Sequence, residues 1–303
     1  MDDVALGVKV FTRADQLQGL LESVAGTEIP TVYIADDGEM TEKKAEIYST
    51  EYSFETVVLD LDYDVGLGYG RREIVENLDE EFLLIVDTDH RVPENISVLR
   101  DQMVQRPEIG GISGLLYEHG EITAVCHDLY ERGGILLRDK KSRKQVEMVA
   151  GYPLVQFDFI PNVAMFRREC VTEYCWDPEY VIGKEHLDFY VGHMKNTDWE
   201  FAINPSVLFD HYPDSGGSDY ERNRQSIEKL SNTKRYFLEK WGYSGIVLGQ
   251  TDWINSANTQ LYSRDSVVEN MIKYVLLEMP PSVQSAVMRL RDRRRKQKGR
   301  APL

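Results

Sequence analysis

Two carboxylates and a histidine follow a short apolar segment, and their spacing suggests metal or sugar chemistry. Residues 82–86 are all apolar, which predicts a strand buried on both faces. Asp87, Asp89 and His90 come directly after this strand. In open α/β sheets, ligands bind at the carboxyl ends of the strands. Two such carboxylates can hold one hard cation, or one can hold a cation and the other a sugar hydroxyl. A plain aspartate turn before Pro93 is the alternative.

Charged groups at two other predicted strand ends extend this pattern. Asp36 and Asp37 close a predicted strand at 31–38, where a carboxylate can accept the imide N–H of a uracil ring. Arg71 follows the glycine-rich segment 66–70 at the start of a predicted helix, a place that favours a phosphate or a carboxylate nearby. The glycine spacing does not fit a dinucleotide-binding fingerprint. An aspartate–glycine turn and an exposed arginine pair are the simpler alternatives.

A later segment, 176–193, concentrates acids, a histidine and aromatic rings. A general base must take a proton from an attacking hydroxyl, and Glu185, His186 and Asp188 are the candidates here. Aromatic rings offer sugar faces an apolar platform. The same acids could also stabilise a helix N-terminus without any catalytic role. His211 follows another predicted strand, and a neutral imidazole is a good ligand for Mn²⁺.

The predicted elements place these groups at strand ends of one sheet. Strands alternate with helices at short spacing, which predicts a parallel sheet with right-handed crossovers. The strands are expected at 4–11, 31–38, 55–61 and 82–86, and the helices at 14–24, 41–50 and 66–78. Beyond residue 105 the pattern is mixed, and it becomes mostly helical at 220–241, 265–278 and 282–296. We therefore expect a catalytic domain over 1–215 and a helical region with a basic tail over 216–303.

Charge separates the end of the chain from the rest. The 303 residues carry a formal net charge of −16, which argues against specific nucleic-acid binding and also fits a saline, haloarchaeal-type cytoplasm. Residues 289–303 nevertheless hold eight Lys or Arg residues against Asp292 alone. Three cysteines without a C-x-x-C pair indicate a reducing compartment, and the acidic N-terminus is unlike a signal peptide. No apolar stretch approaches the roughly 20 residues that cross a bilayer. We expect a cytoplasmic protein, soluble or peripheral.

The carboxyl-terminal segment combines apolar residues with this basic end. Residues 267–277 place apolar side chains at near-helical spacing, and Val283, Val287 and Leu290 follow beside the arginines. An amphipathic helix with a polybasic end can lie on an anionic lipid surface, where each Lys or Arg contributes about 1 kcal/mol. The sequence therefore predicts attachment to the cytoplasmic face of the cell membrane. A solvated basic tail or an RNA-binding end is the alternative.

Taken in order, these groups resemble the family 2 glycosyltransferases of the GT-A fold over about residues 5–213. "YIADDGEM" is similar to that family's uracil-binding V-x-D-D-G-S segment, and "DVGLGYGRREIV" to its N-x-G-x-x-x-A-R-N segment. "LLIVDTDH" is similar to its metal-binding D-x-D segment, and "GKEHLDF" to its G-E-D-x-E-F segment, where the second acid is the catalytic base. This chain has His186 at that base position. The resemblance implies an α/β GT-A nucleotide-diphospho-sugar transferase fold, with a mostly parallel central sheet flanked by helices and a carboxyl-terminal helical extension.

The resemblance also implies an activity: a metal-dependent, inverting glycosyltransferase with a nucleotide-diphosphate sugar, most simply a UDP-sugar, as donor. Glu185, His186 or Asp188 would act as the base on an acceptor hydroxyl. A polyprenyl- or dolichyl-phosphate-linked glycan, built for protein or surface glycosylation, would suit the predicted membrane attachment. The remaining implied roles are nucleotide-sugar binding by Asp36, Asp37, Arg71 and Asp87, and binding of Mn²⁺ or Mg²⁺ by Asp89, His211 and His90.

Two other classes of protein compete with this interpretation. A sugar-phosphate nucleotidyltransferase shares the general fold, but it needs a G-x-G-T-R-L-type loop after the first strand, where this chain has "FTRADQL". A non-catalytic carbohydrate-binding or scaffold protein would not need the metal-binding segment.

Overall fold

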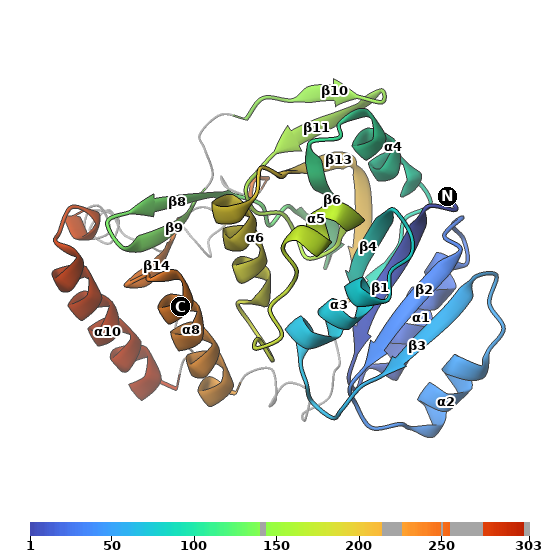
Figure 1. The fold of residues 1–303 in the computed structure, drawn as a ribbon, viewed down its shortest axis with the longest axis horizontal. Coiled ribbons are helices and arrows are strands. Elements are labelled where there is room, and N and C mark those ends of the chain that lie inside the picture. Colours follow the sequence, from blue (N-terminus) through green and yellow to red (C-terminus); the bar gives the residue numbers. More distant parts are fainter. Residues whose placement is uncertain (140–143, 214–225, 250, 255–274, 300–303) are drawn as a thin grey trace.

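The computed structural model describes residues 1–139, 144–213, 226–249, 251–254 and 275–299 (Figure 1). Its centre is a mixed sheet whose first half is parallel, in the order β3-β2-β1-β4. Each connection contains a helix, as the predicted alternation requires. The strands are β1 (Val4–Val10), β2 (Thr31–Asp36), β3 (Glu55–Asp60) and β4 (Phe82–Asp87), and the helices are α1 (Ala14–Val24), α2 (Glu42–Ser49) and α3 (Leu67–Glu76).

The second half of the sheet is mixed. β12 (Ala164–Arg167) runs antiparallel between β4 and β6 (Ile109–Glu118), and β13 (Glu200–His211) lies parallel to β6. The sheet ends with two antiparallel pairings, of β11 with β13 and of β10 with β11. The remaining strands of this sheet are β5 (His90–Arg91), β7 (Glu121–Thr123), β10 (Glu147–Val149) and β11 (Tyr152–Gln156). The helices of this half are α4 (Ser97–Gln105), α5 (Arg168–Glu173) and α6 (Glu185–Asn196).

Two apolar layers hold the helices on the two faces of the sheet. Alternate side chains of β1 point to opposite faces, so Leu6 and Val8 join the layer that contains the apolar residues of α1 and α4. Ala5 joins the other layer, with residues of α3, α5 and α6. Gly7 points to the same face as Ala5, and a Cβ there would come within 2.8 Å of Ile74. Small residues in the central strand therefore let α3 approach the sheet closely.

The carboxyl-terminal part of the chain is helical but also contributes a strand. α8 (Ile227–Trp241) and α10 (Pro281–Gln297) confirm the helices predicted near 220–241 and 282–296. Between them, β14 (Gly245–Leu248) pairs in parallel with β9 (Ile135–Asp139), which pairs with β8 (Asp128–Arg132) in a second sheet.

Two further predictions concern this part of the chain. The boundary at 215 and all but the last residues of the helix at 265–278 lie outside the described residues, and the division into two domains stays a prediction. None of the described helices has the length and apolarity that crossing a bilayer requires.

The first turn of α3 lies against the loop before α6, and this contact generates a prediction. A Cβ at Gly68 would clash with the backbone oxygen of Asp177, whereas a Cβ at Gly19, in α1, meets only the flexible end of Arg91. We expect Gly68→Ala to lower the free energy of unfolding by about 1–3 kcal/mol. Gly19→Ala, the control, should change it by less than about 1 kcal/mol because Ala favours the helix. Equal urea midpoints for the two variants would contradict this account.

Candidate functional site

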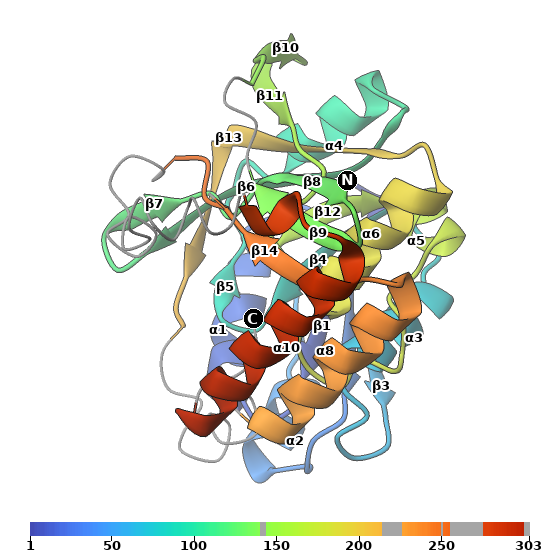
Figure 2. The same ribbon diagram turned by 90° about the vertical axis from the view of Figure 1, so that its left-hand side faces the viewer.

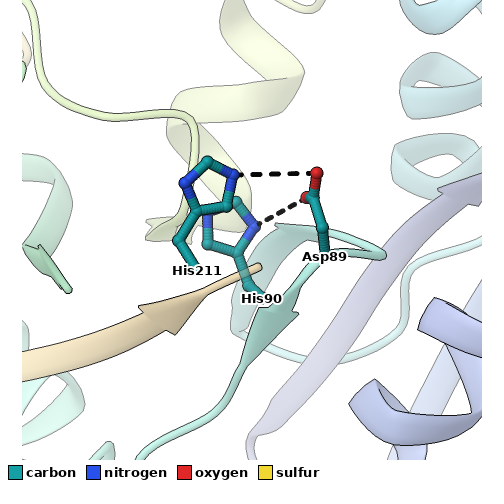
Figure 3. A group of neighbouring side chains, drawn as sticks. All are labelled: Asp89, His90 and His211. Atoms are coloured by element: carbon teal, nitrogen blue, oxygen red, sulfur yellow. Dashed lines mark ion pairs between the residues drawn. The ribbon is translucent and has the colours of Figure 1, made fainter. Parts of the chain in front are cut away.

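Three potential metal ligands meet where β4 ends (Figure 3). β5 pairs antiparallel with the end of β13, which places His90 directly opposite His211. Their imidazole rings stack with centroids 4.6 Å apart. Asp89 faces both rings, with its carboxylate 3.5 Å from His90 Nδ1 and 3.7 Å from His211 Nε2. The potential ligand atoms of these residues all lie within 4.8 Å of one another, so the structure brings together the predicted metal-binding residues.

The electrostatics of this cluster suit a divalent cation. Burial opposes ionisation of Asp89, but His211, His90 and Arg13 outweigh it and hold the pKa of Asp89 below its ordinary value. Burial lowers the pKa of His90, so its ring is neutral and can act as a ligand. With both imidazoles in the neutral form, these residues provide two nitrogen ligands and one carboxylate, a donor set that fits Mn²⁺.

Two charged residues around this cluster were not singled out from the sequence. Arg13, just before α1, forms an ion pair with Asp89. Glu118, at the end of β6, lies 2.9 Å from Nδ1 of His211. Burial opposes protonation of His211, but these two carboxylates, Asp89 and Glu118, raise its pKa above the ordinary value. The position of Glu118 at a strand end was a usable signal, whereas Arg13 is an ordinary residue of a loop.

A buried arginine joins the end of β4 to the start of α6. Arg71 Nη2 lies 3.2 Å from Asp87 Oδ1, and its Nη1 lies 3.7 Å from Glu185 Oε1. The guanidinium also lies over the ring of Trp176, 5.6 Å from its centroid. Arg71 is 2% exposed, whereas the Asp87 side chain is 34% exposed and accessible to a ligand. The structure therefore connects three of the predicted site residues in one charged group.

Glu185 and His186 occupy the first turn of α6, and both are buried. Burial raises the pKa of Glu185, and Arg71 opposes that shift. Its Oε2 has no hydrogen-bond partner among the described residues. The ring of His186 donates from Nε2 to the backbone oxygen of Ile160 at 3.1 Å, and burial lowers its pKa to about 3. The imidazole is therefore neutral and a poor proton acceptor at neutral pH.

Asp188 has a different environment, because its carboxylate anchors α8 to α6. It accepts hydrogen bonds from the Tyr180 hydroxyl at 2.9 Å and from Trp241 Nε1 at 2.8 Å. Tyr174 and Lys240 also donate to it, at 3.2 and 2.9 Å. Asp188 is fully buried. Both oxygens are thus used within the protein.

The two aspartates at the end of β2 also have partners within the protein. Asp36 accepts hydrogen bonds from Lys44 Nζ at 2.7 Å and from the Tyr48 hydroxyl at 2.6 Å. Asp37 lies 2.5 Å from Lys9 Nζ and accepts a hydrogen bond from the backbone N–H at the N-cap of α3 at 2.9 Å. These contacts fix the end of β2 to β1, α2 and α3. A role for either aspartate in holding a nucleobase stays a prediction.

Comparisons with known proteins identify the fold. No family model and no curated protein matches the sequence. Among solved structures, S. aureus TarS is similar with a TM-score of 0.50 and 13% identity, over 78% of this chain and 40% of TarS. The mannosyltransferase PcManGT from Pyrobaculum calidifontis, in complex with GDP-Man and Mn²⁺, gives a TM-score of 0.48 and 13% identity over 77% of this chain and 64% of PcManGT.

The likeness to TarS is one of fold, and the chain spans about 40% of the length of that protein. Together with the sheet order, it confirms the predicted fold, an α/β GT-A nucleotide-diphospho-sugar transferase fold with helices on both faces of the central sheet and a carboxyl-terminal extension. The sheet is parallel over β3, β2, β1 and β4 and mixed beyond them.

The four hydrogen bonds to Asp188 predict a structural effect. Asp188→Ala should lower the free energy of unfolding by about 3 kcal/mol, because it leaves buried donors without an acceptor. Asp198, which is exposed just after the end of α6, is a matched control whose Ala variant should differ from wild type by less than about 0.5 kcal/mol. Urea denaturation followed by circular dichroism measures both. Equal stability of the two variants would show that the anchor is dispensable.

Proposed function

We propose that this protein is a glycosyltransferase that moves a sugar from a nucleotide-diphosphate donor to an acceptor hydroxyl. The observation that carries the proposal is the meeting of two groups where β4 of a GT-A sheet ends. One is the cation-binding cluster of Asp89, His90 and His211. The other is the Arg71 pair with Asp87 and Glu185. The first suits a diphosphate with its cation, and the second suits the reacting sugar and its acceptor.

The donor is proposed to be a UDP-sugar, bound with Mn²⁺ or Mg²⁺. Asp89, His90 and His211 would hold the cation, which neutralises negative charge on the departing diphosphate. Asp87 is partly exposed beside Arg71, so it can accept a hydrogen bond from a ribose or sugar hydroxyl. Asp36 and Asp37 are already paired with Lys44 and Lys9. Either aspartate could accept the uracil N–H only as an additional hydrogen bond.

Among the three candidate bases, we assign the role to Glu185. It has an oxygen without a partner among the described residues and a raised pKa, whereas His186 is a weak base and Asp188 is saturated with donors. In the reaction, Glu185 takes the proton of the acceptor hydroxyl while the oxygen of that hydroxyl forms a bond to the anomeric carbon. The bond from that carbon to the diphosphate breaks on the opposite side, so the configuration inverts.

The acceptor is proposed to be a lipid-linked glycan at the cytoplasmic face of a membrane. α10 supports this proposal, because one face of this helix is apolar in its amino-terminal part and basic at its carboxyl-terminal end. Val283, Val287 and Leu290 are exposed at 40%, 36% and 57%. Arg294 and Lys298 continue the same helical stripe. Such a face can lie in a lipid interface with its cations at anionic head groups.

Nucleotide binding tests the proposal at its first step. Calorimetric titration of the protein with UDP should give at least tenfold tighter binding with Mn²⁺ than without it. Asp89→Asn should lose that difference, because a carboxylate ligand becomes a neutral amide. Asp198→Asn is the control. A screen of nucleotide sugars should then show Mn²⁺-dependent release of UDP. No UDP binding, or release of inorganic diphosphate from UTP and a sugar phosphate, would contradict the proposal.

The pH dependence of kcat/KM tests the assignment of the base. A base works only when ionised, so kcat/KM should rise with pH through a pKa above the ordinary glutamate value of about 4.3. Glu185→Gln should lower kcat by about 10²–10⁴-fold and abolish this rise of kcat/KM with pH. His186→Gln should retain the rise. If the rise of kcat/KM with pH is lost in His186→Gln and retained in Glu185→Gln, His186 is the base.

Membrane attachment is checked by co-sedimentation with vesicles. Val287→Ser with Leu290→Ser should reduce pelleting with vesicles that contain anionic lipid, because the apolar face no longer enters the interface. Val283 remains in place, so the expected loss is partial. A pair of serine substitutions at the exposed residues Val104 and Met194, on other helices, is the control. Equal pelleting of both variants and of wild type would show that the apolar face of α10 does not contribute to membrane binding.

A further inference from the structure

A groove of about 710 Å³ runs between α8 and α10, which lie side by side (Figure 2). We call it the α8–α10 groove. Its apolar lining includes Leu238 and Tyr243. Its charged lining is dominated by cations, although the protein as a whole is strongly acidic. The charged residues that line it are Lys234, Arg235, Arg289, Arg293 and Lys296, against Glu239 and Asp292.

The cations on the α10 side form a regular row. Arg289, Arg293 and Lys296 follow at intervals of four and three residues, so they share one face of the helix. Among the described residues, no carboxylate lies within ion-pair distance of any of these three side chains. On the opposite wall, Lys234 is paired with Asp292 at 2.5 Å. The groove therefore holds more positive charge than its own acids balance, which is complementary to an anion.

α8, which forms one wall of this groove, also contacts the turn that precedes the proposed base. The hydroxyl of Thr233, in α8, donates to the backbone oxygen of Ile182 at 3.1 Å, just before α6 begins. Lys184, which follows in a left-handed conformation with φ of 70°, directly precedes Glu185. Burial and the nearby charges of Arg138, Lys234 and Arg291 lower the pKa of Lys184 to about 7. α8 thus lies between the groove and the start of α6, and Lys234 of the groove is near enough to Lys184 to affect its charge.

We propose that the α8–α10 groove binds the phosphate of a lipid-phosphate acceptor, an inference that rests on the proposed function. Guanidinium groups of Arg289 and Arg293 match the geometry of phosphate oxygens. Leu238 and Tyr243 provide apolar surface for the first carbons of the lipid chain. The volume lies within the range of about 300–1,000 Å³ that is usual for small-ligand sites. A soluble polyanion without an apolar part would gain no binding free energy from this apolar lining.

The exposed apolar face of α10 also indicates that the bound phosphate belongs to a lipid. Val283, Val287 and Leu290 are exposed on the same helix whose cations line the groove. A helix that lies on the membrane with these residues would hold the groove at the level of lipid phosphates. The phosphate would then remain bound while the glycan attached to it extends towards Glu185. The acceptor class is therefore a monophosphate or diphosphate of a long isoprenoid or similar lipid.

The test is a calorimetric titration of the full chain with farnesyl monophosphate, below its micelle-forming concentration. Farnesol and inorganic phosphate are the parallel probes. We expect farnesyl monophosphate to bind at least tenfold more tightly than either probe alone. The double variant Arg289→Gln, Arg293→Gln should weaken this binding at least tenfold. The double variant Arg294→Gln, Lys298→Gln removes two cations from another face of the same helix, and it should bind farnesyl monophosphate within twofold of wild type.

Several outcomes would overturn the proposal. Equal losses in the two double variants would show general attraction between a basic helix and an anion, without a site. Equal binding of inorganic phosphate would exclude the apolar part of the site. If the first double variant fails to fold by circular dichroism, Arg293→Gln alone should weaken binding in the same direction, and an unchanged affinity would overturn the proposal.

Titration with UDP and Mn²⁺ on the same samples separates the two proposals. Retained UDP binding without binding of farnesyl monophosphate overturns the groove assignment alone. Absence of UDP binding in the wild type overturns the proposed function, and the farnesyl titration then still decides whether the groove is a lipid-phosphate site.

Discussion

The buried guanidinium of Arg71 is the interaction on which the geometry of the site depends. It contacts Asp87 at the end of β4 and Glu185 at the start of α6, and it comes from the first half of α3. A buried cation must have anionic partners, since an unpaired charge in the interior is very costly. Two consecutive elements, α3 and β4, and the distant helix α6 therefore have to meet at one point. The position of Glu185 relative to the end of β4 follows from this requirement.

Around this point, charge is compensated within the protein before any ligand is present. Arg13 pairs with Asp89, Lys44 with Asp36, and Lys9 with Asp37. These pairs keep acids close together at strand ends without strong mutual repulsion. A diphosphate with its cation would add opposite charges in nearly equal number, so it could enter without upsetting this balance. The internal pairs thus leave this acidic sheet edge nearly balanced in charge, which suits the anionic donor proposed above.

The amino-terminal half of the fold could be predicted because its signals are local. Apolar runs that alternate with amphipathic segments indicated β1 to β4 and their helices, and Thr41 caps α2 locally by accepting from the N–H of Lys44. The pairing of β5 with β13 could not be predicted, because a two-residue strand has no pattern of its own. That pairing is what brings His90 opposite His211. The sequence therefore indicated the candidate metal ligands by type and order, and the long-range register supplied their proximity.

The candidate base was harder to predict, because burial decides the chemistry of each acid and histidine. Glu185, His186 and Asp188 look alike in the sequence as polar residues near a helix start. In the structure, Asp188 is an anchor and His186 is a neutral ring packed on aromatic side chains. Neither the four donors around Asp188 nor the apolar surroundings of His186 has a local signal, since several of these neighbours come from distant segments.

The parallel pairing of β14 with β9 has a consequence for how the chain folds. These strands lie more than 100 residues apart in the chain, from Ile135 to Gly245. Closing so long a loop costs entropy before the pairing returns any stabilisation, and such non-local contacts form slowly. The second sheet cannot be completed until residues 245–248 have been synthesised, after all strands of the central sheet. We therefore expect α8 and α10 to dock late, so that the central sheet of a nascent chain can fold before the α8–α10 groove exists.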